Sequence, residues 1–539
     1  RYSRQRTPTM RVLSSFGLLL SFMPGLFAQL GGRTLYLEEI AIPNVPAVHS
    51  FAWAEHDGEW LVLGGRTDGL HQRQPFAAFL AADNNTTAHV VDPVNGQVWS
   101  APLSGLPAAQ YEQLQSTNME FLQRDTVLYM IGGYGFSATA NDHITHAAIT
   151  AANVPALIAA IKANAPLSAH FRSLNDARMA VTGGGVLLKD DFFHLVGGQR
   201  FIGRYNPMGP GFGPGFVQEY TNAIRRFRVN DDGLNLSIAG YTEVVDTNHL
   251  HRRDYNLVPQ VLADGTEAFT AFSGVFQYGN NIPWLNVVDI VDSTYTVVPG
   301  FEQLLNHYHS AHAPLFDSVS NTMSTVFFGG IAQFYFDGNG VLFDDPNVPF
   351  VNTISVVERD AANVRTEMAI GEMPALLGAG AEFIPLASVP HTASGIIRLD
   401  QLAGDTVLIG HVLGGIESSA ANIFFVNTGT QSAASTRVFR VFLIDMGTGI
   451  AGTEAPAPLM NVLAPLGAAH WTVRLDLPES DTVVLRLLDT HGRMVRNLLE
   501  ARLPAGKQEM HVPVGDLATG GYIVELITSR TRHGVPCMK

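Results

Sequence analysis

The sequence predicts an all-β fold built from a repeated structural unit, and three observations support this prediction. A chain of 539 residues that is 46% hydrophobic is too long for one ordinary domain unless that domain is repetitive. Glycine (52) and proline (29) are abundant while charged residues make up only 15%, a mixture that suits short strands joined by turns. A short apolar run ending in Gly-Gly or Ser-Gly occurs six times, which indicates one supersecondary unit copied around a ring or along an array. The six runs are Leu61–Gly65, Val127–Gly133, Phe192–Gly198, Ala268–Gly274, Val326–Gly330 and Val407–Gly415.

Each of these runs follows a second strand-like segment, so the two together predict a hairpin. In the first unit, Ser50–Glu55 and Trp60–Gly65 flank a turn at His56-Asp57-Gly58. Apolar runs of strand length bounded by Asp and Gly are typical of hairpins with largely buried strands. A further strand pair follows, most clearly Ala88–Asp92 and Gln97–Ala101, which gives four strands in each unit.

Four strands with Gly-Gly closing the second resemble the kelch repeat, and the segment Val90–Trp99 matches its third and fourth strands. The other units lack the tryptophan of this segment. The resemblance covers residues 33–446, and six copies imply a six-bladed kelch-like β-propeller. Thr34–Ile42 is a strand without an earlier partner, so we expect it to close the ring by pairing with Arg437–Ile444 of the last blade.

Two insertions interrupt the predicted ring. Ala151–Ala165 reads as a short amphipathic helix, with Asn153 as N-cap and Pro155 in the first turn. Gly203–Gly215 has alternating glycines, but its prolines remove amide donors and no helix follows, so it predicts a structured loop rather than a phosphate site.

The N-terminus predicts a secretion signal over residues 1–28. Met10-Arg11 precedes the apolar run Val12–Phe22, and Ala28 offers a small residue at the cleavage point. The alternative is a membrane anchor, but the run is short for spanning. No other stretch approaches membrane-spanning length, so we expect no integral membrane span after cleavage. The net charge of −15 without a basic run argues against nucleic acid as a partner, and a single cysteine, Cys537, excludes an internal disulfide framework.

The C-terminal part of the chain predicts a separate small domain. Residues 447–458 are rich in Gly, Ala, Pro and Thr and read as a linker before an all-β domain at 459–539. This domain resembles the C-terminal sorting domain of the type IX secretion system through Val484–Asp489, Val512–Ala518 and Gly520–Val524. Two features depart from that family: Ala464-Pro465-Leu466 replaces its usual Asn-Pro, and the tail carries Cys537. The resemblance implies that residues 459–539 engage the type IX machinery. It places the protein outside a Gram-negative cell, either secreted or attached to the outer surface.

Propellers bring the residues before each first strand to one face, around the central channel. We therefore expect a funnel-face site built from His49, Asn118, Arg178, Arg253, His312 and His391. Beside Arg253, His251 and Asp254 suggest proton transfer, and the arginine itself suggests a clamp for a carboxylate or phosphate. The alternative is that Arg253 and Asp254 form ion pairs that hold neighbouring blades together.

Two further groups of residues suggest binding. His307, His309 and His312 are weak candidates for a metal site, since alternate histidines on an extended segment face the same way; the alternative is hydrogen-bonded structural histidines. Arg204 and Tyr205 combine charge with an aromatic ring, which suits sugars or peptides, or else they simply pack the long loop.

These observations leave three function classes open. The leading hypothesis is an exported propeller that binds a glycan or protein ligand through its funnel face. The second is a carbohydrate-active enzyme, a sugar isomerase or lyase, that uses His251, Arg253, Asp254 and His312. The third is a structural component of the envelope. No cofactor is expected.

Overall fold

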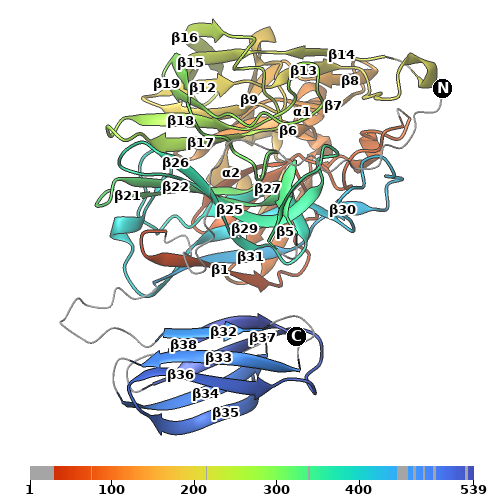
Figure 1. Ribbon diagram of the computed structural model, residues 1–539. Coiled ribbons are helices and arrows are strands. Elements are labelled where there is room, and N and C mark those ends of the chain that lie inside the picture. The colour runs from red at the N-terminus through yellow and green to blue at the C-terminus, as the bar shows by residue number, and fades with distance from the viewer. Residues whose placement is uncertain are drawn as a thin grey trace. The chain divides into compact units, whose positions relative to one another are not determined.

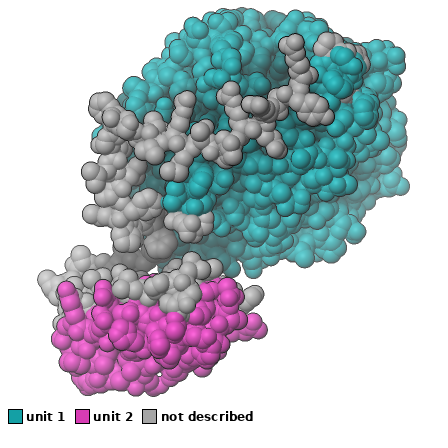
Figure 2. Space-filling view, turned by 45° about the vertical axis from the view of Figure 1, so that its right-hand side comes forward, with its two compact units in different colours: residues 1–447 teal, residues 448–539 magenta. Residues whose placement is uncertain are grey.

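The computed structural model describes residues 30–445, except 75, 214 and 338–339, and residues 459–539, except 465–468, 478–479, 490–492 and 529–531. The predicted signal (1–28) and the predicted linker (447–458) lie outside the described residues. The chain divides into two units, residues 1–447 and 448–539 (Figure 2). Within the part that the structure describes, no helix is both long and apolar enough to cross a membrane.

The first unit is a six-bladed β-propeller, in which each blade contains four consecutive antiparallel strands. The first three blades are β2 (Ala52–His56), β3 (Glu59–Leu63), β4 (Thr87–Asp92) and β5 (Gln97–Pro102); β6 (Thr117–Arg124), β7 (Val127–Ser137), β9 (Ala148–Asn153) and β10 (Phe171–Asn175); and β11 (Gly185–Lys189), β12 (Phe192–Val196), β15 (Ala223–Asp231) and β16 (Leu236–Val245).

The other three blades follow the same order from the innermost strand outward. They are β17 (Asn256–Val261), β18 (Glu267–Phe272), β19 (Val288–Val291) and β20 (Thr294–Val297); β21 (His312–Asp317), β22 (Thr322–Ile331), β25 (Phe350–Arg359) and β26 (Arg365–Glu372); and β27 (Leu376–Pro385), β29 (Thr406–Ser418), β31 (Val438–Asp445) and β1 (Arg33–Ile40). Short additional strands lie in the loops: β8 (Asp142–Thr145), β13 (Gln199–Ile202), β14 (Val217–Tyr220), β23 (Phe334–Phe336), β24 (Leu342–Asp344), β28 (Ile397–Arg398) and β30 (Ser432–Ala434).

The first strand of the chain closes the ring. β1 pairs antiparallel with β31 from Arg33, opposite Asp445, to Ile40, opposite Val438 (Figure 1). The predicted closure is therefore confirmed, and the strand ends two residues earlier than expected. Because β1 is the outermost strand of blade six, the ends of the propeller are joined by a complete set of strand hydrogen bonds rather than by a loop.

The Gly-Gly pairs form the joints between neighbouring blades. The amide of Gly133 in blade two donates to the carbonyl of Val181 before blade three, and Gly415 of blade six donates to Val48 before blade one, each at 2.9 Å. Gly132 has a φ of +64°, and a Cβ placed on it would collide with the Val181 carbonyl. The repeat thus needs glycine because two backbones meet at this point without room for a side chain.

Apolar clusters between neighbouring blades form the core. Helix α2 (Val154–Lys162) belongs to the cluster between blades one and two, where it buries Leu157, Ile158 and Ile161. Its N-cap is Asn153, as predicted, and the carboxamide oxygen accepts a hydrogen bond from the amide of Ala156. The helix is shorter than expected, because the residues before Val154 complete β9. A second helix, α1 (Ala108–Leu114), precedes blade two.

The predicted loop at 203–215 forms the tip of a hairpin. Its flanks are β13 and β14, which pair from Gln199, opposite Tyr220, to Ile202, opposite Val217. Ile202 also pairs with Ile144 of β8, so the hairpin extends the sheet of blade two. In the sequence, however, the hairpin follows the Gly-Gly of blade three. Figure 1 shows β8, β13 and β14 together.

The second unit is a small β-sandwich of a three-stranded and a four-stranded sheet. The strands are β32 (Leu459–Leu463), β33 (His470–Leu477) and β36 (Gly506–Pro513) in one sheet, and β35 (Met494–Leu503), β34 (Asp481–Asp489), β37 (Gly521–Ile527) and β38 (Arg532–Met538) in the other. Trp471, Leu475, Leu485 and Leu526 are buried between them. The sequence predicts five of these strands, at Trp471–Leu477, Thr482–Asp489, Met494–Glu500, Lys507–Val512 and Gly521–Thr528. β32 and β38 are additional, and β38 occupies the tail that carries Cys537.

Candidate functional site

Six backbone amides form a closed hydrogen-bonded ring around the propeller axis. Each lies just before or within the start of an innermost strand, and each donates to the corresponding residue of the preceding blade. Ser50 donates to Gly380, Asn118 to Ser50, Gly183 to Asn118, Asp254 to Gly183, His309 to Asp254 and Gly380 to His309, at 2.7–3.4 Å. One residue from each blade therefore meets the others at the axis, and we call these six residues the axial ring.

Four of the residues expected at the funnel face lie in this ring or beside it. Asn118 is a ring member, as is Asp254, the neighbour of Arg253 in the chain, and both have a φ of +48°. His49 and Arg253 directly precede ring members, and each forms a backbone bridge to the residue after the Gly-Gly or Ser-Gly of its own blade. His312 lies three residues beyond the ring member His309, and its Nδ1 is 2.9 Å from the carbonyl oxygen of Ser310.

The other two residues expected at the funnel face, Arg178 and His391, do not lie beside the axial ring. Arg178 pairs with Asp176 at 2.5 Å and stacks over Tyr241 of β16, the outermost strand of blade three. His391 follows the first strand of blade six instead of preceding it, because that strand is β27, and its backbone bridges to Ile397. The prediction for blade six is therefore wrong. β27 begins Leu-Leu-Gly-Ala-Gly-Ala, and glycine and alanine have low β propensity, so its sequence conceals the strand.

Four titratable side chains from four blades form the channel cluster: Glu120, Asp254, His309 and Glu382. His309 Nε2 lies 3.1 Å from Glu382 Oε1, and the Arg253 guanidinium bonds directly to the Asp254 carboxylate. Glu120 accepts a hydrogen bond from the amide of Gly184 at 2.6 Å. The sequence reasoning missed the two glutamates. Each lies two residues beyond a ring member. This spacing identifies them only when the residues that form the axial ring are known.

The protein environment changes the protonation of this cluster. Burial raises the pKa of Glu120 to about 8, although the Gly184 amide and His309 favour the charged form. Burial alone would lower the pKa of His309, but the hydrogen bond and charge of Glu382 outweigh it and raise that pKa. Burial thus favours the protonated carboxyl group of Glu120, while the contact with Glu382 favours the imidazolium form of His309.

Aromatic rings surround Arg253 on the blade-three and blade-four side. Its Nε donates to the hydroxyl of Tyr220 at 3.1 Å, and its guanidinium lies 5.1 Å from the ring centroid of Phe276. His251 stacks between Tyr220 and Tyr278, with centroid distances of 3.7 and 4.2 Å. Burial, and then the charge of Arg253, lower the pKa of His251, so its role here is that of a neutral stacking group.

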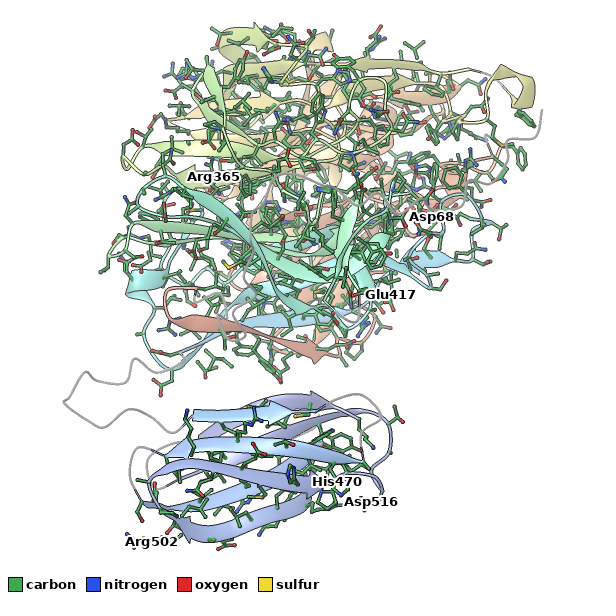
Figure 3. The ribbon with its side chains drawn as sticks, in the orientation of Figure 1. Asp68, Arg365, Glu417, His470, Arg502 and Asp516 are labelled. Atoms are coloured by element: carbon green, nitrogen blue, oxygen red, sulfur yellow. The ribbon has the colours of Figure 1, made fainter. Side chains whose placement is uncertain are left out.

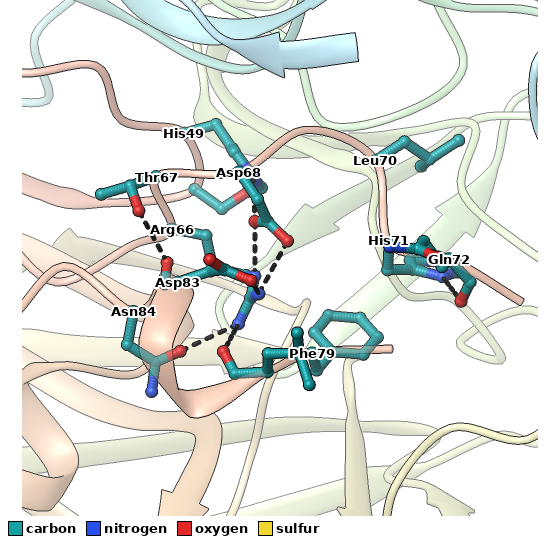
Figure 4. Close-up of polar contacts among 12 residues, drawn as sticks. His49, Arg66, Thr67, Asp68, Leu70, His71, Gln72, Phe79, Asp83 and Asn84 are labelled. Carbon is teal, nitrogen blue, oxygen red and sulfur yellow. Dashed lines mark hydrogen bonds and ion pairs between the residues drawn. The ribbon is translucent and has the colours of Figure 1, made fainter. Parts of the chain in front are cut away.

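A loop from blade one, residues 66–86, reaches the same face, and we call it the cover loop. Arg66, with a side chain only 2% exposed, donates from Nε and Nη2 to both oxygens of Asp68, at 2.8 and 2.7 Å (Figure 4). The same guanidinium donates to Asn84 at 2.9 Å, while His49 Nε2 lies 3.7 Å from Asp68. A buried, fully bonded arginine thus fixes the start of the cover loop to its end.

The cover loop packs against the loops of other blades through aromatic rings. His71 stacks on Phe79 at 4.8 Å and meets the edge of Tyr205, from the 203–215 hairpin, at the same distance. Arg204 donates to the carbonyl of Phe76 at 3.3 Å. Leu70 receives a hydrogen bond from the Asn427 side chain at 2.6 Å. Both predicted loop residues, Arg204 and Tyr205, therefore tie the hairpin to the cover loop.

The three histidines proposed as metal candidates have other partners. His307 is fully buried; its Nδ1 accepts from the amide of Gln333 and its Nε2 faces the carbonyl of Gln303, each at 3.0 Å. Both ring nitrogens are thus used, which leaves no lone pair for a metal. His309 pairs with Glu382 as described. Across the described ranges, no group of three His, Cys, Asp or Glu side chains is arranged to hold a metal ion.

A groove of about 290 Å³ lies away from the axial ring, lined by residues that include Asp289, Tyr295 and Asn363. Asp289 binds Arg365 of β26 at 2.8 Å. Figure 3 shows Arg365 on a different side of the propeller from Asp68. Two acidic side chains line this groove, Asp264 and Asp289, and Asp289 is already paired; we place the candidate site at the axial ring, where side chains of four blades meet.

Comparison with known proteins finds similarity to solved structures. No family model and no curated protein matches the sequence. Among solved structures, that of YjhT is similar to this chain, with 12% identity over 75% of this chain and 99% of that chain, at a TM-score of 0.40.

Proposed function

We propose that this protein is an exported kelch-type propeller that binds a glycan or protein ligand at the axial ring. The observation that supports this most is the convergence of Asp254, His309, Glu382 and Glu120, from four different blades, beside Arg253. These side chains are far apart in the sequence, so only the fold brings them together. A set of donors and acceptors at the end of a channel is the usual form of a small-ligand site.

Among ligands, a glycan suits the surroundings best. The ring is bordered by Tyr220, Tyr278, His71 and Tyr205, whose faces can stack on the apolar face of a sugar. Carboxylates, an imidazolium and a guanidinium supply the bonds that sugar hydroxyls make. We therefore favour a glycan, with a protein ligand as the alternative outcome.

Glycan-array binding followed by calorimetry tests this proposal. Arg253→Ala should weaken binding at least about tenfold, because it removes a charged hydrogen-bond donor worth roughly 1.5–3 kcal/mol. Arg178→Ala is the matched control. This arginine also pairs with an aspartate and stacks on a tyrosine, but that tyrosine, Tyr241, belongs to the outer strand β16. Equal effects of the two variants, or no ligand at all, would contradict the proposal and favour a structural envelope role.

One observation favours an enzyme, a sugar isomerase or lyase, as the second candidate. Burial raises the pKa of Glu120 to about 8, and Glu382 raises the pKa of His309; perturbed pKa values of this kind are typical of acid–base sites. Of the residues proposed from the sequence, Arg253 and Asp254 stay in this role, while the rings of His251 and His312 are already bonded. Under this hypothesis, Glu120→Gln abolishes turnover and leaves ligand affinity within about threefold.

We also propose that residues 459–539 carry the protein through the type IX secretion system to the cell surface or the medium. The support is the sequence resemblance together with the compact β-sandwich of this segment. Deletion of 459–539 in a host with this system should leave the propeller inside the cell envelope. Surface exposure of the truncated protein, measured by protease accessibility, would refute the assignment.

A further inference from the structure

We propose that the ligand of the axial ring is uncharged, a neutral polyhydroxylated compound such as a neutral sugar residue. This inference rests on the proposed function and names the chemical class that the site accepts. It follows from how the charges of the channel cluster are already balanced within the protein.

Each cation at the ring has its own carboxylate partner. Arg253 bonds to Asp254, its neighbour in the chain, and His309 pairs with Glu382 across the joint between blades five and six at 3.1 Å. The remaining carboxyl group is that of Glu120, whose Oε1 accepts a hydrogen bond from the amide nitrogen of Gly184 at 2.6 Å. Burial keeps this group protonated at neutral pH, since its pKa is about 8. The channel cluster with Arg253 therefore carries no net charge.

The cations that approach the cluster from the cover loop also have partners within the protein. Arg66 binds Asp68 through two hydrogen bonds, and Asp83 lies 3.7 Å from the same guanidinium. Burial lowers the pKa of His71 to about 4 and also lowers that of His312, so both rings are neutral at pH 7. The other cover-loop cation, Arg73, lies over the rings of Phe424 and Phe425, 5.5 and 4.7 Å from their centroids, so each cation named here already has a partner.

A charged ligand would have to break one of these pairs. A ligand carboxylate at Arg253 would compete with Asp254, and repulsion by Asp254 and Glu382 would offset the attraction of Arg253 and His309. A ligand ammonium group would meet Arg253 and His309 in the same way. Because the ring lies deep in the protein, where effective dielectric constants are low, such unpaired charges are costly.

A hydroxyl group meets no such penalty. The four paired side chains keep accessible edges: His309 is 31% exposed, Asp254 21%, Arg253 16% and Glu382 11%. These edges present both N–H donors and carboxylate acceptors, and a sugar hydroxyl donates and accepts at once. Hydrogen bonds to charged groups are the stronger ones, so a neutral ligand gains affinity without disturbing the pairs.

The test compares glycans that differ only in charge. An array of neutral, uronic-acid and free-amino glycans is probed with the full chain. Calorimetry then compares the best neutral glycan with its uronic-acid and amino counterparts. We expect the neutral member to bind at least about tenfold tighter than either counterpart. Its Kd should change less than about twofold between roughly 50 and 500 mM salt, because an uncharged ligand has no charge to screen.

Two variants should change the charge preference in a defined direction. Asp254→Asn leaves Arg253 without its carboxylate and should raise affinity for the uronic acid. Glu382→Gln should raise it less, because without Glu382 burial lowers the pKa of His309. Asp176→Asn is the control, because it breaks a similar pair with Arg178 in the connection between β10 and β11, outside the channel cluster. A wild-type preference for acidic or amino glycans, or unchanged preference in both variants, overturns this inference while the binding function stands. If the wild type binds no glycan, the proposed glycan-binding function fails, and this inference fails with it.

Discussion

The joints between blades allow a sharp test of the propeller assignment through Gly132→Ala. At this position φ is +64° and the new Cβ would collide with the carbonyl of Val181, which accepts the amide of Gly133 at 2.9 Å. The left-handed conformation costs an alanine about 1–2 kcal/mol. Displacement of the Val181 carbonyl leaves a buried acceptor unbonded, at about 1–3 kcal/mol. Together these terms predict a loss of about 2–5 kcal/mol in the free energy of unfolding.

Scanning calorimetry of the full chain measures this loss as a lower Tm of the propeller transition. The control is Gly105→Ala, because Gly105 has ordinary φ and nothing lies within 4 Å of its added Cβ. That substitution should leave stability within about 1 kcal/mol, since the change acts mainly through the unfolded chain. If the two variants shift the transition equally, Gly132 is not a joint, and close backbone approach does not explain the repeated glycines.

Three further predictions concern the charges and the second unit. The pKa of Glu120 is raised from its ordinary value of 4.5 to about 8, so its contribution to stability is full below pH 4.5 and is lost as pH rises through 8. Glu120→Gln should therefore raise Tm more at pH 8 than at pH 5, and an equal gain at both would contradict the shift. Asp68→Asn leaves Arg66 buried without its partner and should cost about 3–5 kcal/mol in urea unfolding, against at most about 1 kcal/mol for the exposed pair broken by Asp176→Asn. Leu475→Ala should cost about 2–5 kcal/mol and lower only the calorimetric transition of the second unit, so a shift in the propeller transition would refute independent cores.

Most of the propeller could be predicted because its repeat is marked by backbone requirements that leave a trace in sequence. Gly-Gly at each joint is required by close backbone approach, as at Gly132 and Gly414, where a side chain would strike the next blade. The closing strand was predictable because an apolar segment without a local partner needs one elsewhere. The blade-six inner strand escaped prediction because its glycine- and alanine-rich start, Leu376–Ala381, has no strand pattern.

The site was less predictable than the fold because its register depends on contacts between blades. Arg253 and Asp254 were identifiable from their position before a strong strand. Glu120 and Glu382 were not, since a glutamate within a strand reads as a solvent-facing residue until the strand is placed at the axis. His309 was considered only as a metal candidate, and its pairing with Glu382 joins segments 73 residues apart in the chain (309 to 382).

The hydrogen bonds of the axial ring do not depend on the side chains that could bind a ligand. Only backbone amides and carbonyls form the ring, so its hydrogen bonds place no demand on the six side chains. The backbone conformation does restrict the residue type. Asp254 has a φ of +48°, which asparagine adopts readily and alanine does not. Asp254→Asn therefore keeps both shape and conformation while it removes one charge, whereas Asp254→Ala would add backbone strain. A change in ligand preference in Asp254→Asn with an unchanged Tm would thus report the chemistry of the ring alone.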